Sequence, residues 1–576
     1  MRNKMKIPRG WIIGLAGAVF VAAALKVGLL LAGAVPFNAD EAIVALMARH
    51  ILEGERPVFF YGQSYMGSLD AYLISGMFKL IGNQVWGVRF VQIGLYSLTI
   101  ITTALLGKQL TGKWKVGVLA AWFLALPNIS TTLYTTVSMG GYGEMLLIGN
   151  LILLTTLKIV RDLSNSEEKI SFIPWFGLGF LSGFGLWVFG LTLVYSIPAF
   201  IYLFWHCTYY EPISRLSKFL FPWRRNTLFN PDAFEKKEPV YQSKFWGAAL
   251  IGGIFGVIPW LAYAQRTGHS NLLLELSGSA VAGVESLEPF RQILRHVQNL
   301  SLFGTTVIFG LRPPWEIRWL ALPLAPFVLI FWIGVIVFAA KKTKSDIQLN
   351  PRDADYSHAP LLSGVVLMVV IGFILSPFGA DPSGRYFLPV GVVMAIFAAQ
   401  AVWKWHTRWG SYVWIAVGVV LCFHLWGTIQ VARNYPPGMT TQFDAVTQID
   451  HQYDQELIEF LQTQGETRGY TTYWVAYPLA FLSDEGLVYV PKLPYHQDLR
   501  YTSRDNRYQP YDQLVNQSDR TAYITTDNPL LNELLRKGFS ELGVRWKETT
   551  IGDYQVYYQL SRRVNPEEIS LRGGEG

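Results

Sequence analysis

The chain has 576 residues, of which 51% are hydrophobic, 15% aromatic and only 15% charged. This apolar content exceeds that of an ordinary soluble domain. The net charge of +7 does not indicate nucleic-acid binding, because the basic residues form short clusters between apolar runs and no basic stripe is interleaved with stacking aromatics. The two cysteines, Cys207 and Cys422, lie within or beside apolar runs and have neither a metal-ligand spacing nor a credible disulfide partner.

Apolar runs long enough to cross about 30 Å of hydrocarbon recur from Trp11 to Trp426. We interpret the first of them as a retained span, because it is too long for a signal peptide and lacks a clear cleavage site. The sequence therefore predicts about eleven transmembrane helices in a membrane domain covering residues 1–428. The expected spans lie near residues 11–34, 87–107, 114–128, 142–160, 172–185, 187–205, 245–263, 320–340, 361–377, 386–402 and 411–428.

Lys and Arg clusters alternate with loops that are poor in basic residues. Cytoplasmic loops of membrane proteins carry the excess of Lys and Arg, so the pattern predicts a cytoplasmic N-terminus and an extracytoplasmic C-terminus in the plasma membrane. The clusters assigned to the cytoplasm are Lys108, Lys113 and Lys115; Lys158, Arg161 and Lys169; Arg215, Lys218, Arg224, Arg225, Lys236 and Lys237; and Lys341, Lys342 and Lys344.

Residues 429–576 are polar and alternate helical and strand patterns, which predicts a small extracytoplasmic α/β domain. Strands are expected at 470–475, 487–490, 522–525 and 554–560, with an amphipathic helix at 456–461. A further helix should begin after Asn528-Pro529 and end at Gly538. The aromatic cluster Tyr470, Tyr473, Trp474 and Tyr477 fits either sugar stacking or the core of this domain, and we favour the core.

The first outside loop opens with Asn38-Ala39-Asp40-Glu41 and continues as a predicted helix from Ala42 to Glu53, ending at Gly54. A second helix is expected from about residue 64 to residue 80, so that two juxtamembrane helices occupy about residues 40–82. Both are too short to span and are expected to lie at the headgroup level, with Asp40, Gln63 and Asp70. The alternatives are a helix-capping role for Asn38 or Asp40 and a solvated or internally paired charge for Asp70.

Two further charged residues mark the outside ends of later spans. Glu144 follows the turn 135–143 and begins the fourth span, where an acid is costly unless it is paired, hydrated or used. Placement near a helix N-terminus would also explain it. Arg385 enters the span after the loop 376–384; its guanidinium suits a phosphate ester, although snorkelling to the interface is the alternative.

Taken together, these residues resemble the GT-C superfamily of membrane glycosyltransferases, particularly the branch of protein mannosyltransferases and lipid A aminoarabinose transferases. Asp40-Glu41 followed by two juxtamembrane helices is similar to the acidic pair and first outside loop of that superfamily. Glu144 matches the second acidic position, and Arg385-Tyr386-Phe387-Leu388-Pro389 is similar to a late segment of many bacterial members. The tail lacks a Trp-Trp-Asp motif, so transfer of a whole oligosaccharide to asparagine is not expected.

The resemblance implies an enzyme of the cell envelope that moves one sugar, hexose or pentose, from a polyprenyl-phosphate donor to a lipid, glycan or protein acceptor, with inversion. Asp40 would be the general base, Glu41 and Glu144 would orient hydroxyl groups, and Arg385 would hold the carrier phosphate. Asp70 and Gln63 are secondary candidates for sugar contact. The resemblance implies no certain cofactor and leaves dependence on a divalent cation open.

Two other classes of protein are considered. A transporter or flippase of lipid-linked sugars should place charges near midspan and show paired halves, and the sequence has few midspan charges and no repeated halves. In a structural or receptor-like assembly, Asp40 and Glu144 would serve the fold alone. Conversion of Asp40 to Asn separates these hypotheses, because Asn can still cap a helix but cannot act as a base.

Overall fold

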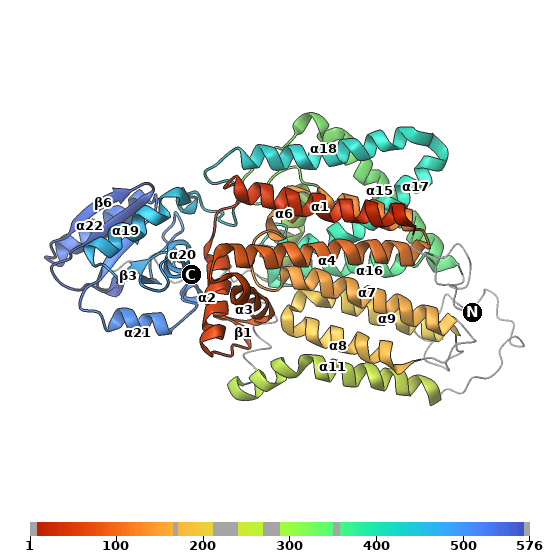
Figure 1. Cartoon of the computed structure of the whole chain (residues 1–576), viewed down its shortest axis with the longest axis horizontal. Helices are drawn as coiled ribbons and strands as arrows, with labels where there is room; N and C mark the ends of the chain where they lie inside the picture. Colours follow the sequence, from red (N-terminus) through yellow and green to blue (C-terminus); the bar gives the residue numbers. More distant parts are fainter. Residues whose placement is uncertain (1–7, 165–170, 211–239, 269–287, 350–356, 570–576) are drawn as a thin grey trace, which may run out of the picture.

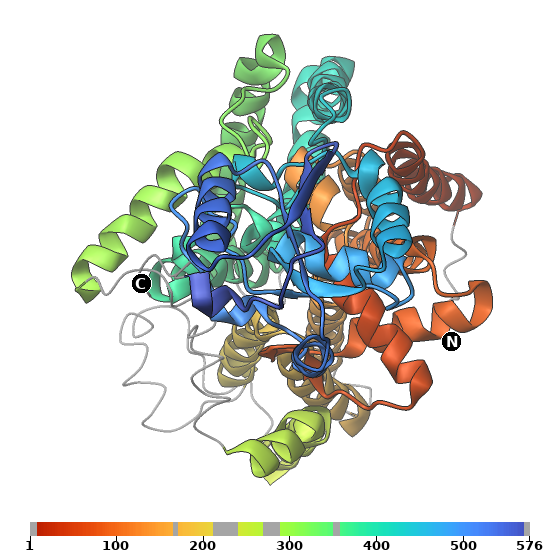
Figure 2. The same cartoon turned by 90° about the vertical axis from the view of Figure 1, so that its left-hand side faces the viewer.

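The computed structural model describes residues 8–164, 171–210, 240–268, 288–349 and 357–569. Figure 1 shows long helices lying side by side, with a region of helices and strands from the C-terminal part of the chain at one end. Seen from that end, these C-terminal elements lie over the ends of the helices (Figure 2). We call residues 445–569 the C-terminal region.

Each of the eleven predicted spans contains a helix. Within the described residues, seven segments are long and apolar enough to cross a membrane, and one of them, Arg385–Ala432, contains two helices. The three remaining predicted spans contain shorter apolar helices. The helices are α1 (Arg9–Leu31), α4 (Val85–Thr111), α5 (Trp114–Ala125), α7 (Tyr142–Ser164), α8 (Phe172–Val188), α9 (Leu193–Tyr210), α11 (Val240–Thr267), α15 (Ala325–Gln348), α16 (Ala359–Leu375), α17 (Leu388–Trp409) and α18 (Val413–Ala432).

The outer faces of these helices are apolar. Phe20 of α1, Leu250 of α11 and Ile330 of α15 are 71%, 66% and 68% exposed. Long apolar faces of this kind suit hydrocarbon, in which a helix satisfies all of its own backbone hydrogen bonds. The chain is therefore a multi-pass membrane protein with the expected helical fold class.

Some basic clusters extend helices instead of forming loops. Lys341, Lys342 and Lys344 lie in the last turns of α15, which continues to Gln348. Lys108 lies in the last turn of α4. Lys169 and the cluster 215–237 lie outside the described residues.

The first outside loop differs from its prediction. Helix α2 (Ala39–Glu53) ends at Gly54 as expected. However, residues 64–67 are not helical: β1 (Phe59–Phe60) and β2 (Gln63–Gly67) form an antiparallel hairpin before α3 (Leu69–Ile81). The turn Tyr61-Gly62 places Gly62 at φ 69°, which favours a tight hairpin. A Cβ on Gly67 would lie 2.7 Å from the Trp187 carbonyl oxygen, so the strand packs directly on the end of α8.

Short helices connect the spans on the same side as this hairpin. Lys26 of α1 is buried and donates to the hydroxyls of Thr135 and Thr136 at 2.7 and 2.8 Å, which fixes the turn before α7. The short elements are η1 (Gly190–Thr192), α6 (Ile129–Tyr134), α13 (Pro289–Gln298), η5 (Asn299–Gly304), α14 (Thr305–Ile308), η6 (Leu322–Leu324), η7 (Pro377–Ala380) and η8 (Arg385–Phe387). A further short helix, η9 (Gly410–Tyr412), joins α17 to α18 at the opposite end of the helices (Figure 1).

The C-terminal region contains a five-stranded sheet in the order β4-β3-β5-β7-β6. The first three strands are parallel, and β7 is antiparallel to both β5 and β6. Its elements are α19 (Asp454–Gln464), β3 (Arg468–Thr471), α20 (Tyr473–Leu482), β4 (Val488–Pro491), α21 (Pro510–Asn516), β5 (Ala522–Thr525), α22 (Pro529–Glu541), β6 (Lys547–Ile551) and β7 (Tyr554–Tyr558), with η10 (Ala445–Thr447), η11 (His451–Tyr453), η12 (Ser503–Asp505) and η13 (Pro566–Ile569).

Two predictions for this region need correction. The expected strand 470–475 ends at Thr471, and its second half is the start of α20. The apolar run was ambiguous because both faces of α20 are buried, so it shows no helical periodicity. Helix α22 begins after Asn528 as expected but continues past Gly538 to Glu541. Gly538 serves packing and not helix termination, because a Cβ at this position would lie 2.1 Å from Ile569.

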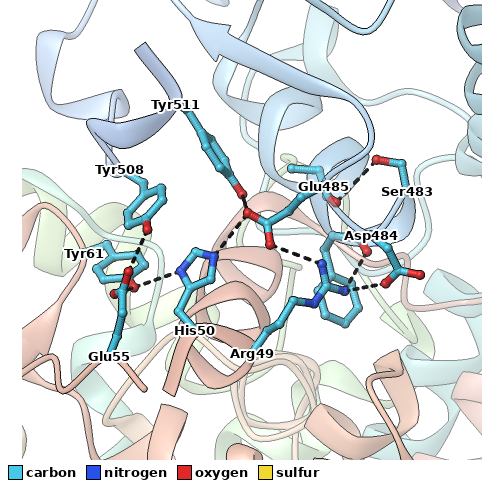
Figure 3. Close-up of polar contacts among 11 residues, drawn as sticks. Arg49, His50, Glu55, Tyr61, Ser483, Asp484, Glu485, Tyr508 and Tyr511 are labelled. Carbon is cyan, nitrogen blue, oxygen red and sulfur yellow. Dashed lines mark hydrogen bonds and ion pairs between the residues drawn. The ribbon is translucent and has the colours of Figure 1, made fainter. Parts of the chain in front are cut away.

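A polar network attaches the C-terminal region to α2 (Figure 3). Arg49 donates to Asp484 at 2.9 Å and forms an ion pair with Glu485 at 3.6 Å. Glu485 also contacts His50 at 3.1 Å and accepts a hydrogen bond from Tyr511 at 2.7 Å. Helix α2, which carries Asp40 in its first turn, is therefore held by charged contacts near its C-terminal end.

A second set of contacts joins the hairpin to the same network. The Tyr61 hydroxyl donates to Glu55 at 2.5 Å and lies 3.0 Å from Nδ1 of His50. Tyr508 also donates to Glu55, at 2.7 Å, and its ring stacks on His50 with centroids 4.7 Å apart. Helix α2, the hairpin and the C-terminal region thus meet at one place.

Candidate active site

The two acids at the start of α2 have different surroundings. The Asn38 side chain caps the helix by accepting a hydrogen bond from the Glu41 amide at 3.1 Å. Asp40 is therefore not needed as the cap, and its side chain is only half-buried. Glu41 is completely buried. Of the pair, Asp40 is the residue that a substrate can reach.

Glu41 is engaged inside the protein. It forms an ion pair with Arg89 of α4 at 2.6 Å and accepts a hydrogen bond from the Ser138 amide at 3.2 Å. Burial raises the pKa of Glu41 to about 7, although the charge of Arg89 and the Ser138 amide act to lower it. The structure brings Glu41 to α4 and to the turn before α7, where it fixes the start of α2.

Asp70 and Glu144 form a second acidic pair beneath the surface. Asp70 is 2% exposed and accepts hydrogen bonds from Gln92 at 2.9 Å and from the Ser138 hydroxyl at 2.5 Å. Burial raises the pKa of Asp70, against the effect of these hydrogen bonds and of Glu144 nearby. Glu144, also 2% exposed, has no hydrogen-bond partner for either carboxylate oxygen among the described residues. Ser138 therefore contacts both Asp70 and Glu41, the first through its hydroxyl and the second through its amide.

Arg385 lies in the short helix before α17 and is 26% exposed. Asp381 forms an ion pair with it at 2.5 Å, and its guanidinium lies 5.1 Å from the centre of the Tyr386 ring. The pairing with Asp381 was not predicted. It holds the guanidinium in place and balances its charge.

Tyr134 lies close to Asp381 and Arg385. Burial raises the pKa of the Tyr134 phenol, the charges of Asp381 and Asp40 raise it further, and the charge of Arg385 lowers it. The Tyr134 hydroxyl donates to the Ser383 carbonyl at 3.4 Å. Tyr134 therefore links the end of α6 to the loop that precedes Arg385.

The C-terminal region contributes two residues that sequence reasoning missed. The Tyr473 hydroxyl donates to Asp40 at 2.6 Å. The Arg507 guanidinium lies 5.6 Å from the centre of the Tyr473 ring, and with the Gln63 amide oxygen facing it, both terminal nitrogens donate to that oxygen at 2.8 Å. Tyr473 belongs to the aromatic cluster noted in the sequence, and all four members are buried; no sequence signal distinguished Arg507.

A series of side chains leads from Asp40 toward Arg385. Tyr473 donates to Asp40, the Arg507 guanidinium lies over the Tyr473 ring, and Tyr65 of β2 lies within electrostatic range of Arg507. The Tyr65 ring lies 6.3 Å from Phe378, which lies 5.2 Å from Tyr386 beside Arg385. A carboxylate and two guanidiniums in such a series can bind an anionic group and accept a proton.

An apolar, partly open cavity adjoins Arg385. Gly384 and Phe387 form part of its wall, and it continues between the spans along α5 and α17, past Phe123 and Met394. A chain of hydrocarbon is the ligand that such a cavity suits.

Among the described residues, no group of three or more His, Cys, Asp or Glu side chains is arranged to hold a metal ion. Asp40 and Asp505 interact electrostatically, but they do not meet a third ligand of this kind. The residues at this site therefore do not fit a metal centre formed by the described protein side chains alone.

Comparison with solved structures gives the class of fold. The crystal structure of ArnT from Cupriavidus metallidurans bound to undecaprenyl phosphate matches with a TM-score of 0.53 and 12% identity, covering 99% of this chain and 100% of that chain. Its apo form matches with a TM-score of 0.52 and 12% identity over 98% and 99%. The chain has the fold of ArnT.

A family model and the solved structure of a second protein also match the chain. The model of the dolichyl-phosphate-mannose-protein mannosyltransferase family matches residues 68–219. The Archaeoglobus fulgidus oligosaccharyltransferase, in its complex with zinc and sulfate, has a TM-score of 0.45 and 13% identity, covering 88% of this chain and 67% of that chain. No curated protein matches the chain in sequence.

Proposed function

We propose that the protein transfers a single sugar from a polyprenyl-phosphate donor to an extracytoplasmic acceptor. The observation that carries this proposal is the half-buried Asp40 carboxylate, which accepts a hydrogen bond from Tyr473, in a loop whose Tyr65 is connected by ring contacts through Phe378 and Tyr386 to Arg385. Transfer between two bound substrates needs a base that deprotonates the acceptor and a cationic group that binds the phosphate of the donor, and the two groups must lie close together.

Asp40 is the general base in this proposal. It takes the proton from an acceptor hydroxyl, whose oxygen forms a bond to the anomeric carbon of the sugar. The bond from that carbon to the phosphate oxygen breaks, and its electron pair leaves with the polyprenyl phosphate. Attack from the side opposite the leaving group inverts the anomeric configuration. Arg385 stabilises the charge that develops on the phosphate, so no proton donor is required there.

The other predicted site residues receive roles that fit their burial. Glu41 is a positioning residue, because its contacts with Arg89 and Ser138 orient the start of α2. Asp70 and Glu144 support the turn at Ser138 from below. Gln63, which is half-buried and holds Arg507, is the remaining candidate for direct contact with a sugar.

The carrier is assigned to the apolar cavity whose wall includes Gly384, next to Arg385, because an apolar cavity suits a polyprenyl chain and a guanidinium suits its phosphate. The ArnT match supports this assignment, because that protein was crystallised with undecaprenyl phosphate. Hexose and pentose donors both remain in this proposal, as do lipid, glycan and protein acceptors.

A flippase is less well supported. Asp40, Arg385 and Arg507 lie at the ends of the helices, and Lys26, which lies within α1, is occupied by threonine hydroxyls. A substrate-translocating site would place exchangeable charges near midspan.

The test is sugar transfer by the purified protein in nanodiscs from a panel of synthetic polyprenyl-phosphate hexoses and pentoses. Asp40→Asn should lower transfer by about 10²- to 10⁴-fold while the protein stays folded, since Asn38 supplies the helix cap. Asp527→Asn, at an exposed site in the C-terminal region, is the matched control. Equal transfer by wild type and Asp40→Asn would remove Asp40 from this role, and no turnover with any donor would favour the flippase.

A further inference from the structure

Arg507 differs from the other buried or partly buried arginines near the site. Arg89, Arg385 and Arg49 each form an ion pair with a carboxylate, at 2.6, 2.5 and 2.9 Å. Arg507 instead donates to two neutral acceptors, the Gln63 side chain at 2.8 Å and the Gly62 carbonyl at 3.5 Å. Its Nε is buried without a hydrogen-bond partner among the described residues.

Asp505 is the acid that acts on Arg507 from the same segment, but among the described residues the two do not form an ion pair. Burial raises the pKa of Asp505 to about 7, against the charges of Arg507 and His496. Asp505 therefore carries only part of a negative charge at neutral pH. The charge of Arg507 is therefore only partly balanced by Asp505. An anion bound beside it would stabilise this charge, because a charge removed from water needs a partner of opposite sign.

Arg507 also lies close to Asp40. Its guanidinium covers the ring of Tyr473, whose hydroxyl donates to Asp40. Tyr65 lies within electrostatic range of Arg507, and its ring contacts Phe378, which contacts Tyr386 beside Arg385. The two guanidiniums come from different parts of the chain, Arg385 from the membrane part and Arg507 from the C-terminal region.

We propose that Arg507 is a substrate-binding residue that holds a phosphate group in this site. This inference rests on the proposed function. The planar guanidinium of Arg507 can donate to two phosphate oxygens at once. Arg507 supplies positive charge that Arg385 cannot fully supply, because Asp381 already balances the charge of Arg385. The phosphate group that Arg507 binds belongs either to the polyprenyl carrier of the donor or to a phosphorylated acceptor.

The first experiment measures binding of undecaprenyl phosphate and of undecaprenol to the full chain in nanodiscs, without any sugar transfer. Wild type should prefer the phosphate, and rising salt should weaken that preference. If Arg507 holds the carrier phosphate, Arg507→Gln should lose about tenfold or more in affinity for undecaprenyl phosphate and none for undecaprenol. Arg500→Gln, at an exposed site in the same region, is the matched control and should bind as wild type does.

The second experiment measures binding of inorganic phosphate to protein already loaded with undecaprenyl phosphate, followed by ³¹P NMR. If Arg507 instead holds the phosphate of an acceptor, Arg507→Gln keeps its affinity for the carrier and loses this second binding. Either loss supports the inference and identifies the source. Unchanged binding of both probes by a folded Arg507→Gln overturns it.

Arg507 also joins the hairpin to the C-terminal region, so a structural role must be separated. Gln63→Glu keeps that contact and places a carboxylate against Arg507, which neutralises the guanidinium without removing it. It should reproduce the loss of phosphate binding if charge is what matters; normal phosphate binding by Gln63→Glu would contradict the inference even if Arg507→Gln fails to fold. Loss of transfer in Asp40→Asn is a separate result, so the inference and the proposed function fail independently.

Discussion

Adjacent residues at the start of α2 show how position along a helix separates two identical charges. Asp40 and Glu41 point to different sides because successive helical residues are rotated by about 100°. One meets Tyr473 at a half-buried surface, and the other meets Arg89 in the interior. The sequence identifies the pair, whereas only the packed structure identifies which member a substrate can reach.

The Tyr473 hydroxyl should matter for catalysis because it orients the Asp40 carboxylate. Tyr473→Phe removes one hydrogen bond to a charged group, worth about 1.5–3 kcal/mol. We expect kcat for sugar transfer to fall about tenfold or more with little change in KM for the donor, because orientation of the base matters most in the transition state. Tyr470→Phe is the control, because it removes a buried hydroxyl bonded to Asn565 in the same region. An equal fall in both variants would indicate a general effect on the fold.

Several site residues could be predicted from sequence because each carries a local signal. Asp40, Glu144 and Arg385 are charges at the ends of apolar runs, where charge is costly. Tyr473 and Arg507 carry no such signal. The bond between Tyr473 and Asp40 joins residues 433 apart in sequence, and a pairing of that range depends on how the C-terminal region sits on the membrane part.

At the scale of elements, α2 is held at both ends. Its first turn contacts Tyr473 and Arg89, and its last turns contact Glu485 through Arg49 and His50. Burial acts to raise the pKa of Glu485, but hydrogen bonds from His50 and Tyr511 and the charges of His50 and Arg49 outweigh it and lower the pKa to about 2.

A carboxylate with a lowered pKa gives stability that is present above its ordinary pKa and is lost as pH falls through its folded value. Attachment of the C-terminal region to α2 should therefore weaken between about pH 4.5 and pH 2. Glu485→Gln should show the weaker attachment at neutral pH, by on the order of 2–3 kcal/mol, and should lose this pH dependence. Hydrogen exchange at α20 and α21 measures the change.

The control for this variant is Glu548→Gln, which removes a carboxylate paired with Arg536 at 3.0 Å on the exposed side of the C-terminal region. Its hydrogen exchange at α20 and α21 should match wild type. If Glu485→Gln exchanges no faster than this control, the network of Figure 3 does not hold the two parts together.

The elements themselves differ in how well sequence predicts them. All eleven predicted spans contain helices, because an apolar run in a membrane has few alternatives to a helix. The hairpin before α3 was missed, since Ser64, Tyr65 and Met66 fit a helical pattern and the two-residue turn at Gly62 was taken for a loop. The second half of the run 470–475 was missed because a helix buried on both faces has no amphipathic pattern.

At the scale of the whole molecule, α1 begins at the end of the helices away from the C-terminal region (Figure 1). With the basic clusters, this predicts a cytoplasmic N-terminus and an extracytoplasmic site. In a protein whose own cysteines are replaced by serine, Asp519→Cys should react with a membrane-impermeant maleimide in intact cells. Lys113→Cys should react only after the membrane is permeabilised. The opposite result would reverse the orientation and place the site on the cytoplasmic side.

The contacts of Asp40 include Tyr473, beside Arg507, and both residues follow all eleven predicted spans in the chain. During translation, the segments that carry Asp40, Glu144 and Arg385 leave the ribosome before these two residues do. A nascent chain that ends before Tyr473 therefore holds Asp40 without the side chain that donates a hydrogen bond to it. The surroundings of Asp40 are complete only when residues 473–507 have folded against α2.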